Sequence, residues 1–216
     1  MLPPTPEGSR MQTKIKFCGI RRREDIAAVN ALRPDYVGFV FWPGSSRAVD
    51  EKMASALRKL LDPNIRTVGV FVDEVPERVA GLVHRGVISA VQLHGHEDRA
   101  YVRQLRGLLG GSGEIWQACI VKSREELRAA AQSPADRLLL DAGRGEGAAF
   151  DWNLLRDFPL PYFLAGGLTA GNVGHAIQRL HPYGVDVSSA IETDGVKDPV
   201  KMEAFSRAVR EAERIG

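Results

Sequence analysis

The chain has 216 residues, of which 44% are hydrophobic and 26% charged, and its formal net charge is +2. This composition is typical of a globular protein with one large or two small domains, and the balanced charge disfavours nucleic acid or a membrane surface as partner. Two cysteines far apart in sequence argue against a secreted disulfide framework, so we expect a cytoplasmic protein. Residues 1–12 are rich in proline and lack an apolar signal segment, and we expect a disordered tail there.

Short runs rich in β-branched and aromatic residues recur along the chain and predict eight strands. They occupy residues 13–19, 36–42, 65–72, 90–95, 114–121, 137–142, 162–168 and 184–192. Most segments between them have the apolar spacing of amphipathic helices. Pro76, Ser123 with Glu126, and Asp198 with Pro199 have the chemistry of helix starts. The chain therefore alternates strand and helix from its first strand to its last.

Eight strand–helix units without an obvious linker predict an α/β fold, a single (β/α)8 TIM barrel spanning residues 13–216. An open doubly wound sheet is the alternative, but its first turn would carry G-x-G-x-x-G, which "FCGIRRR" lacks. The sixth unit departs from the pattern. A Gly-rich segment at residues 143–147 predicts a mobile loop or lid, followed by a short or weak helix.

Polar residues fall on one face of five predicted strands, close to where each strand ends. Alternate residues of a barrel strand point into the barrel and towards the helices, and such barrels keep their sites at the C-terminal ends of the strands. The residues expected to point inward are Lys16, Cys18, Gln92, His94, Gln117, Cys119, Asp141, Asp186 and Ser188. Because buried polar groups are unfavourable unless paired, their recurrence predicts a site at this end.

Cys18 stands at the end of the first predicted strand. Packing is one role for it, because a buried cysteine behaves as a small hydrophobic residue. Its thiol, with an ordinary pKa of about 8.5, would serve as a base or nucleophile where positive charge stabilises the thiolate. We expect Cys119 to be a core residue, and Arg21, Arg22 and Arg23 to be a solvated helix start.

Asp141 and Arg47 are the other candidates for chemistry near strand ends. Asp141 follows three leucines. A carboxyl group beside apolar side chains has a raised pKa, which suits a general acid near neutral pH. A capping role is the alternative. Arg47 lies in the loop after the second strand, where a guanidinium can grip a carboxylate or phosphate through two hydrogen bonds. A solvated loop arginine is the alternative for Arg47.

The turns after the seventh and eighth strands have the composition of phosphate-binding loops. Gly166 and Gly167 leave the seventh strand and lead into a helix, and Ser188 and Ser189 leave the eighth. Glycines let backbone N–H groups approach an anion, and barrels often bind phosphate with these two loops. A tight turn alone would also explain the glycine pair.

Metal and Schiff-base chemistry have weaker support. His94 and His96 form an H-x-H, but only five histidines occur and no further ligand cluster is visible, so we expect no metal. We expect His94 to line the pocket and His96 to be exposed. Lys16 or Lys122 would have to provide the amine of a Schiff-base enzyme.

Six blocks of the sequence resemble the phosphoribosylanthranilate isomerase family of tryptophan biosynthesis. In order they are "KIKFCGI", "GVFVDE", "VQLHGHE", "LLLDA" with "FDW", "FLAGGLTAGNV", and "GVDVSSAIE" with "GVKD". The resemblance runs from residue 14 to the C-terminus. It implies a small barrel enzyme that carries out an Amadori rearrangement of N-(5'-phosphoribosyl)anthranilate without a cofactor.

The family's functional residues fall on matching positions of this chain. The resemblance implies that Asp141 is the general acid and Cys18 the general base. It implies substrate binding by Arg47, His94 and Asp186, and phosphate binding by Gly166, Gly167, Ser188 and Ser189. The chain departs from the family's usual pattern at Arg21, where threonine is common, and at residues 143–147, which read "GRGEG".

Two alternatives stay open at this point. One is a Schiff-base aldolase or synthase of a sugar phosphate, and the other is a phosphate-ligand sensor without catalysis. In every case the expected partner is a phosphorylated small molecule rather than nucleic acid or membrane, and the chain is expected to be a monomer or a homodimer.

Overall fold

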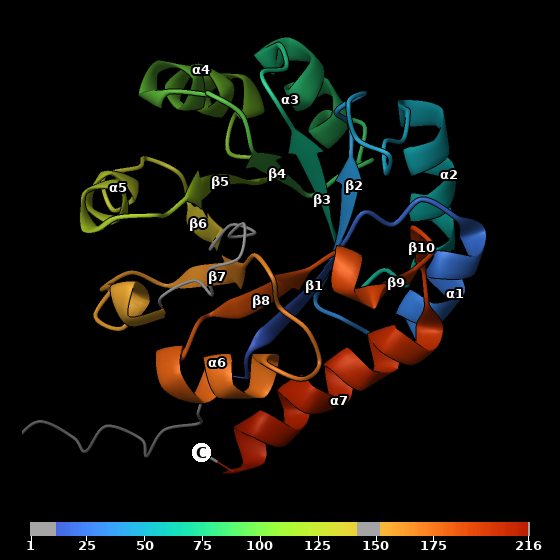
Figure 1. Ribbon diagram of the computed structural model, residues 1–216. Helices are drawn as coiled ribbons and strands as arrows, with labels where there is room; N and C mark the ends of the chain where they lie inside the picture. Colours follow the sequence, from blue (N-terminus) through green and yellow to red (C-terminus); the bar gives the residue numbers. More distant parts are fainter. Residues whose placement is uncertain (1–11, 142–151, 216) are drawn as a thin grey trace, which may run out of the picture.

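The computed structural model describes residues 12–141 and 152–215, and its eight parallel strands form a closed barrel (Figure 1). The strands pair in chain order and β8 pairs with β1, which closes the ring. Their bounds are β1 (Lys14–Cys18), β2 (Tyr36–Val40), β3 (Arg66–Phe71), β4 (Ala90–Leu93), β5 (Glu114–Ile120), β6 (Arg137–Asp141), β7 (Tyr162–Ala165) and β8 (Gly184–Val187). The predicted barrel is confirmed. The tail up to residue 11 and the loop at 143–147 lie outside the described residues.

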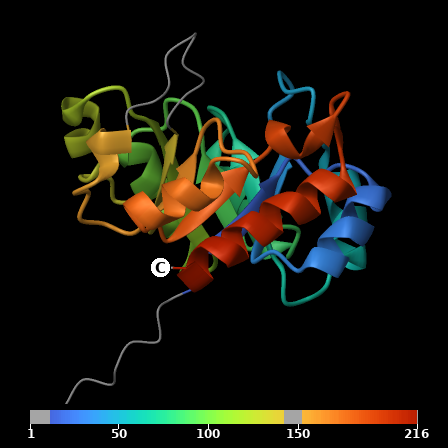
Figure 2. The ribbon, with the colours of Figure 1, turned by 60° about the horizontal axis from the view of Figure 1, so that its bottom comes forward.

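Helices surround the barrel on its outer side (Figures 1 and 2). They are α1 (Arg23–Leu32), α2 (Glu51–Leu60), α3 (Pro76–His84), α4 (Arg99–Leu109), α5 (Arg124–Ala130), α6 (Val173–Leu180) and α7 (Pro199–Ile215). After β6, the described chain resumes with a short 3-10 helix, η1 (Trp152–Leu155). This agrees with the prediction that the sixth helix is short or weak. After β8 come a 3-10 helix, η2 (Ser189–Ile191), and a hairpin of β9 (Glu192–Thr193) and β10 (Val196–Lys197).

The predicted helix starts are present, with one change in detail. Pro76 occupies the first turn of α3, and the Asp198 carboxylate accepts a hydrogen bond from the backbone N–H of Val200 in α7. The Ser123 hydroxyl accepts from the N–H of Glu126. The Glu126 carboxylate, however, accepts from the N–H of Lys122 rather than that of Ser123, so the capping box is displaced by one residue. The starts of α5 and α7 thus have side-chain caps, whereas α3 has none and begins with Pro76, which has no N–H to satisfy.

An aromatic cluster fills the barrel near the N-terminal ends of the strands. Trp116 stacks on Phe163 with ring centroids 4.5 Å apart, and Tyr36 packs edge-on against Trp116 at 4.9 Å. Val68, Ala90 and Leu139 complete this layer, and Ala165 at the end of β7 packs between it and the cavity. A barrel of eight strands has room for such layers and no pore. The space that remains open therefore lies at the opposite, C-terminal end.

The prediction for β5 was wrong: Gln117 and Cys119 face the helices. Trp116 belongs to the interior cluster, so its neighbours on the strand take the outer face. Gln117 donates to the backbone carbonyl of Glu97, and Cys119 packs partly buried against the helix-side core. Polar partners at the helix layer satisfy Gln117 there, so polarity alone was a poor guide to direction. Burial raises the pKa of the Cys119 thiol to about 11, and both cysteines are free.

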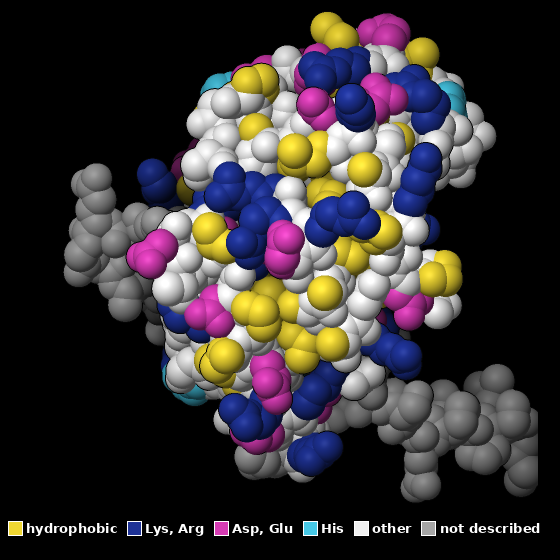
Figure 3. Space-filling model, turned by 90° about the vertical axis from the view of Figure 1, so that its right-hand side faces the viewer, with side chains coloured by type: hydrophobic (Ala, Val, Ile, Leu, Met, Phe, Trp, Pro, Cys, Tyr) yellow, Lys and Arg dark blue, Asp and Glu magenta, His cyan; other side chains and the backbone are white. Residues whose placement is uncertain are grey.

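The face carrying α1 and α2 is mixed in character. Figure 3 shows basic, acidic and hydrophobic side chains interspersed there. A shallow groove runs along this face beside Arg23, Lys52 and Leu60. Within the described parts of the chain, no helix has both the length and the apolar character to cross a membrane.

Candidate active site

One cavity of about 550 Å³ opens at the C-terminal end of the barrel, and all nine predicted site residues line it. They are Cys18, Arg47, His94, Asp141, Gly166, Gly167, Asp186, Ser188 and Ser189. Apolar walls come from Val40, Trp42, Val70 and Val72. Pockets of this size, mostly apolar with a few convergent polar groups, are typical of small-molecule sites.

Cys18 is the last residue of β1 and lies at the floor of this cavity, 8% exposed. Burial raises the pKa of its thiol, and the neighbouring ammonium groups of Lys16 and Lys197 oppose that rise. The Ser188 hydroxyl donates to the Cys18 carbonyl over 3.0 Å, which ties the end of β1 to the turn after β8. The thiol thus occupies a fixed position, buried but in contact with cations.

Asp141, at the end of β6, lies across the cavity with His94 beside it. The His94 Nε2 atom is 3.9 Å from an Asp141 carboxylate oxygen. On its other side, His94 Nδ1 is 3.0 Å from the side-chain nitrogen of Gln92. With Gln92 as the donor, Nδ1 accepts and the proton of a neutral His94 sits on Nε2, facing Asp141. Gln92 was placed on the inward face by the sequence pattern but was not predicted as a site residue.

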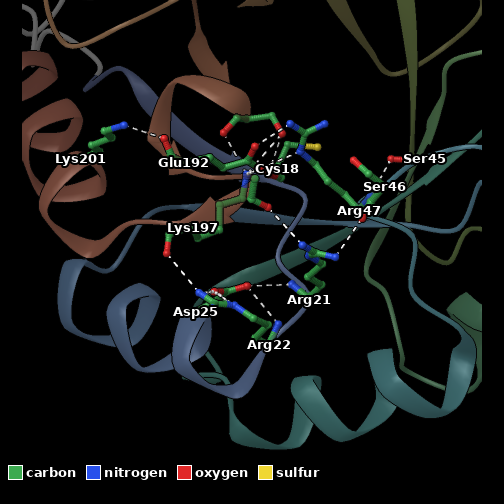
Figure 4. Close-up of polar contacts among 12 residues, drawn as sticks. Cys18, Arg21, Arg22, Asp25, Ser45, Ser46, Arg47, Glu192, Lys197 and Lys201 are labelled. Atoms are coloured by element: carbon green, nitrogen blue, oxygen red, sulfur yellow. Dashed lines mark hydrogen bonds and ion pairs between the residues drawn. The ribbon is translucent and has the colours of Figure 1, made fainter.

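Arg47 reaches the cavity, but its guanidinium already holds an internal carboxylate. Its Nε and Nη2 atoms donate to the two oxygens of Glu192 over 2.7 and 2.6 Å (Figure 4). This is the bidentate geometry expected of an arginine–carboxylate pair. A Cβ at Gly19 would lie 2.5 Å from the Arg47 side chain, so glycine at this position makes room for the arginine.

Glu192 also binds Lys197, and together with Arg47 they form a buried ionic cluster. Lys197 Nζ donates to Glu192 over 2.7 Å and to the Ser188 carbonyl over 2.9 Å. Despite its burial, the two cations hold the pKa of the Glu192 carboxyl at about 2. The sequence prediction missed both Glu192 and Lys197. Their only signal was their place in the "GVDVSSAIE" and "GVKD" blocks.

Arg23 is exposed, as expected of a solvated helix start, whereas Arg21 and Arg22 are half-buried and bind other segments. The Arg21 guanidinium donates to the carbonyls of Ser46 and Gly195, and Arg22 donates to the carbonyl of Lys197 and to Asp25 (Figure 4). These bonds join the start of α1 to the loop after β2 and to the β9–β10 hairpin. Their partners are backbone carbonyls from distant segments, which no local pattern identifies.

The two predicted phosphate loops lie side by side at the cavity rim. Gly166 and Gly167 have φ angles of 87° and 65°, a region that favours glycine. The Asn172 side chain donates to the Gly167 carbonyl, which fixes the turn. Ser188 is the residue before η2, and Ser189, the first residue of η2, lies at the same rim.

No group of three or more His, Cys, Asp or Glu side chains in the described residues is placed to hold a metal ion. His96 is exposed, as predicted, and pairs with Asp73 at 3.0 Å outside the cavity. His94 lines the cavity as predicted. The two histidines of the H-x-H therefore point to different surroundings.

Comparison with known proteins agrees with this geometry. The profile of the family described as N-(5'phosphoribosyl)anthranilate (PRA) isomerase matches residues 15–208. The N-(5'-phosphoribosyl)anthranilate isomerase of Acetivibrio thermocellus is 45% identical over 213 residues, covering 93% of this chain and 97% of that protein. The crystal structure of the Thermotoga maritima phosphoribosyl anthranilate isomerase is 32% identical with a TM-score of 0.83, covering 93% and 100%. A similar structure, also 32% identical with a TM-score of 0.81 and the same coverage, is a complex with reduced 1-(o-carboxyphenylamino)-1-deoxyribulose 5-phosphate. This chain belongs to the N-(5'-phosphoribosyl)anthranilate isomerase family.

Proposed function

We propose that this protein converts N-(5'-phosphoribosyl)anthranilate to 1-(2-carboxyphenylamino)-1-deoxyribulose 5-phosphate in tryptophan biosynthesis, with Asp141 as acid and Cys18 as base. The observation that carries the proposal is that these two groups line one cavity at the barrel mouth. Family membership supports the reaction, and the structure bound to the reduced product analogue supports the ligand class. The rearrangement moves protons without moving electrons to a carrier, so the proposal includes no cofactor.

The proposed reaction has two proton transfers in opposite directions. Asp141 donates a proton to the ribose ring oxygen, the C1'–O bond breaks, and a Schiff base forms at C1'. The Cys18 thiolate then removes the proton from C2', and the electrons of that bond form an enolamine. Tautomerisation to the ketone completes the rearrangement and returns acid and base to their starting forms. Acid–base catalysis of this kind needs both groups within reach of one substrate.

The remaining residues of the cavity would hold the two ends of the substrate. The rim of Gly166, Gly167, Ser188 and Ser189 suits the phosphate, because backbone N–H groups of such turns can approach an anion. Arg47 suits the anthranilate carboxylate. With Nε and Nη2 bonded to Glu192, the guanidinium has its Nη1 edge left for the substrate. His94 and Asp186 would contact the sugar between these two grips.

The alternative functions have less support. Lys122 does not line the cavity, and Lys16 is fully buried and paired with Asp186, which is unfavourable for a neutral Schiff-base amine. A sensor without catalysis would bind the sugar phosphate but leave it unchanged. The T. maritima relative is described as dimeric, and this chain is proposed to be a monomer or a homodimer.

The proposal is tested by replacing Cys18 and Asp141 with alanine separately. Each variant should lose at least about a hundredfold in kcat, as losses of an acid or base usually do, while retaining binding of the reduced product analogue. Cys119→Ala, which removes the other thiol outside the cavity, should keep normal turnover. Turnover close to that of the unmodified protein in either site variant would contradict the assigned roles. Failure of the unmodified chain to rescue a tryptophan auxotroph lacking this isomerase would contradict the function.

A further inference from the structure

A buried ammonium lies inside the barrel directly below the cavity. Lys16 has an exposed fraction of 0%, and its Nζ atom is 2.8 Å from a carboxylate oxygen of Asp186. It follows from the strand pattern that Lys16 and Cys18 point to the same side of β1. A fully buried lysine is rare unless paired, because removing an ammonium from water is unfavourable. Asp186 lines the cavity, so the pair links the buried ammonium to the site.

Gly38 on the neighbouring strand shows how close the ammonium is to the thiol. A Cβ at this position would lie 2.8 Å from the Cys18 sulfur and 3.3 Å from Lys16 Nζ. The sulfur and the nitrogen therefore approach the same point, over a backbone that has no side chain. Cys18 pairs in register with Gly38, so the absence of a Cβ leaves the thiol and ammonium facing each other.

Cations reach Cys18 from three different elements. Titratable or charged groups face it or the cavity from several elements, namely Lys16, Arg47, His94, Asp141, Asp186, Glu192 and Lys197. Lys16 and Lys197 lower the pKa of the Cys18 thiol, and Asp186 raises it. Glu192 is shared by Arg47 and Lys197, and Asp186 is bonded to Lys16. Among these cations, Lys16 is the one that shares a face of β1 with the thiol.

We propose that Lys16 is a positioning residue whose ammonium stabilises the thiolate form of Cys18, against the opposing negative charge of its ion-pair partner Asp186. An opposite charge within roughly 4–6 Å favours the charged form of a titratable group. Burial by itself raises the pKa of the Cys18 thiol, so a cation on the protein side is needed to keep the thiolate accessible. The proposal rests on the proposed role of Cys18 as base and explains how a buried thiol can perform it.

The test measures the thiol itself, without turnover. In a Cys119→Ala background, the rate of iodoacetamide alkylation of Cys18 is followed by mass spectrometry as a function of pH, since the thiolate is the reactive form. Lys16→Met should lower the alkylation rate near pH 7 by at least about tenfold and move the profile to higher pH. Asp186→Asn should move the profile the other way, because it removes a negative charge beside the thiol.

Opposite shifts of the alkylation profile in Lys16→Met and Asp186→Asn would show that charge acts on the thiolate. A general disruption of the site would instead shift both profiles in the same direction. The Lys16→Met/Asp186→Asn double variant leaves no buried charge unpaired and should alkylate at a rate between the two single variants. Lys14→Met is the matched control: Lys14 lies two residues before Lys16 on β1 and forms an ion pair with Asp35, also at 2.8 Å. It should leave the profile unchanged.

An unchanged profile in Lys16→Met, or shifts of the same sign in both single variants, would overturn the inference. Those results would leave the isomerase assignment intact if Cys18→Ala still abolished turnover. Conversely, normal turnover in Cys18→Ala would contradict the role of Cys18 while leaving the measured coupling of Lys16 to the thiol standing.

Discussion

At the scale of single residues, strand parity is what made the site visible in the sequence. Lys16 and Cys18 on β1, and His94 on β4, were placed correctly because alternation is a geometric property of strands. What parity does not give is the partner of each group. The bond between Lys16 and Asp186 joins residues 170 positions apart, and it follows from barrel closure rather than from either local sequence.

Arg47 gives a prediction at this scale. Arg47→Ala should raise KM by roughly ten- to a hundredfold with a smaller change in kcat, because a lost hydrogen bond to a charged group costs about 1.5–3 kcal/mol. Glu192 keeps Lys197 as partner in this variant, so the cluster is not left without a cation. Steady-state kinetics measure the effect, with Arg103→Ala on the exposed face of α4 as the control of equal charge change. An unchanged KM would exclude Arg47 from substrate binding.

At the scale of elements, the hairpin of β9 and β10 is the main feature that sequence reasoning missed. The eighth strand was predicted over residues 184–192 with Ser188 and Ser189 in a phosphate loop, but β8 ends at Val187. The hairpin that follows brings Glu192 and Lys197 to the site. Two-residue strands have too little periodicity to be seen in a sequence. The contacts of Arg21 and Arg22 were not predicted for a related reason. Both side chains bind backbone carbonyls, of this hairpin and of the loop after β2.

Glu192 should hold these elements together in a pH-dependent way. The pKa of its carboxyl is lowered in the folded protein to about 2 from an ordinary value of 4.5. Its stabilising effect is therefore fully present above about pH 4.5 and is lost as the pH falls towards 2. Glu192→Gln should lower the free energy of unfolding near pH 7 by about 3 kcal/mol, because it leaves two cations without their carboxylate.

Urea unfolding at several pH values measures this effect. The difference between Glu192→Gln and the unmodified protein should narrow steadily between about pH 4.5 and pH 2. Glu203→Gln, the same substitution at an exposed position of α7, should change stability by less than about 0.5 kcal/mol. A difference that stays constant over this pH range would mean that Glu192 acts through packing rather than charge.

At the scale of the whole molecule, the eight strands were predictable because a parallel strand buried on both faces is a short, nearly continuous apolar run. Counting such runs indicated a barrel, and the closing pairs between β8 and β1 complete it. The direction of β5 was not predictable in this way. Its register depends on where Trp116 fits among rings from β2 and β7, a question of volume that only the assembled barrel answers.

Trp116 should therefore stabilise the barrel as a unit. It is fully buried, stacks on Phe163 and donates its indole N–H to Glu114 over 3.0 Å. Trp116→Ala should lower the free energy of unfolding by about 3–5 kcal/mol, because the barrel strands cannot collapse into the space it leaves.

Trp42→Ala is the control for this prediction. Trp42 is 44% exposed, so its substitution should lower the free energy of unfolding far less. Urea unfolding followed by both circular dichroism and fluorescence measures the loss. A loss below about 1 kcal/mol in Trp116→Ala would mean that the aromatic layer does not hold the strands together, since buried aromatic truncations cost several times more.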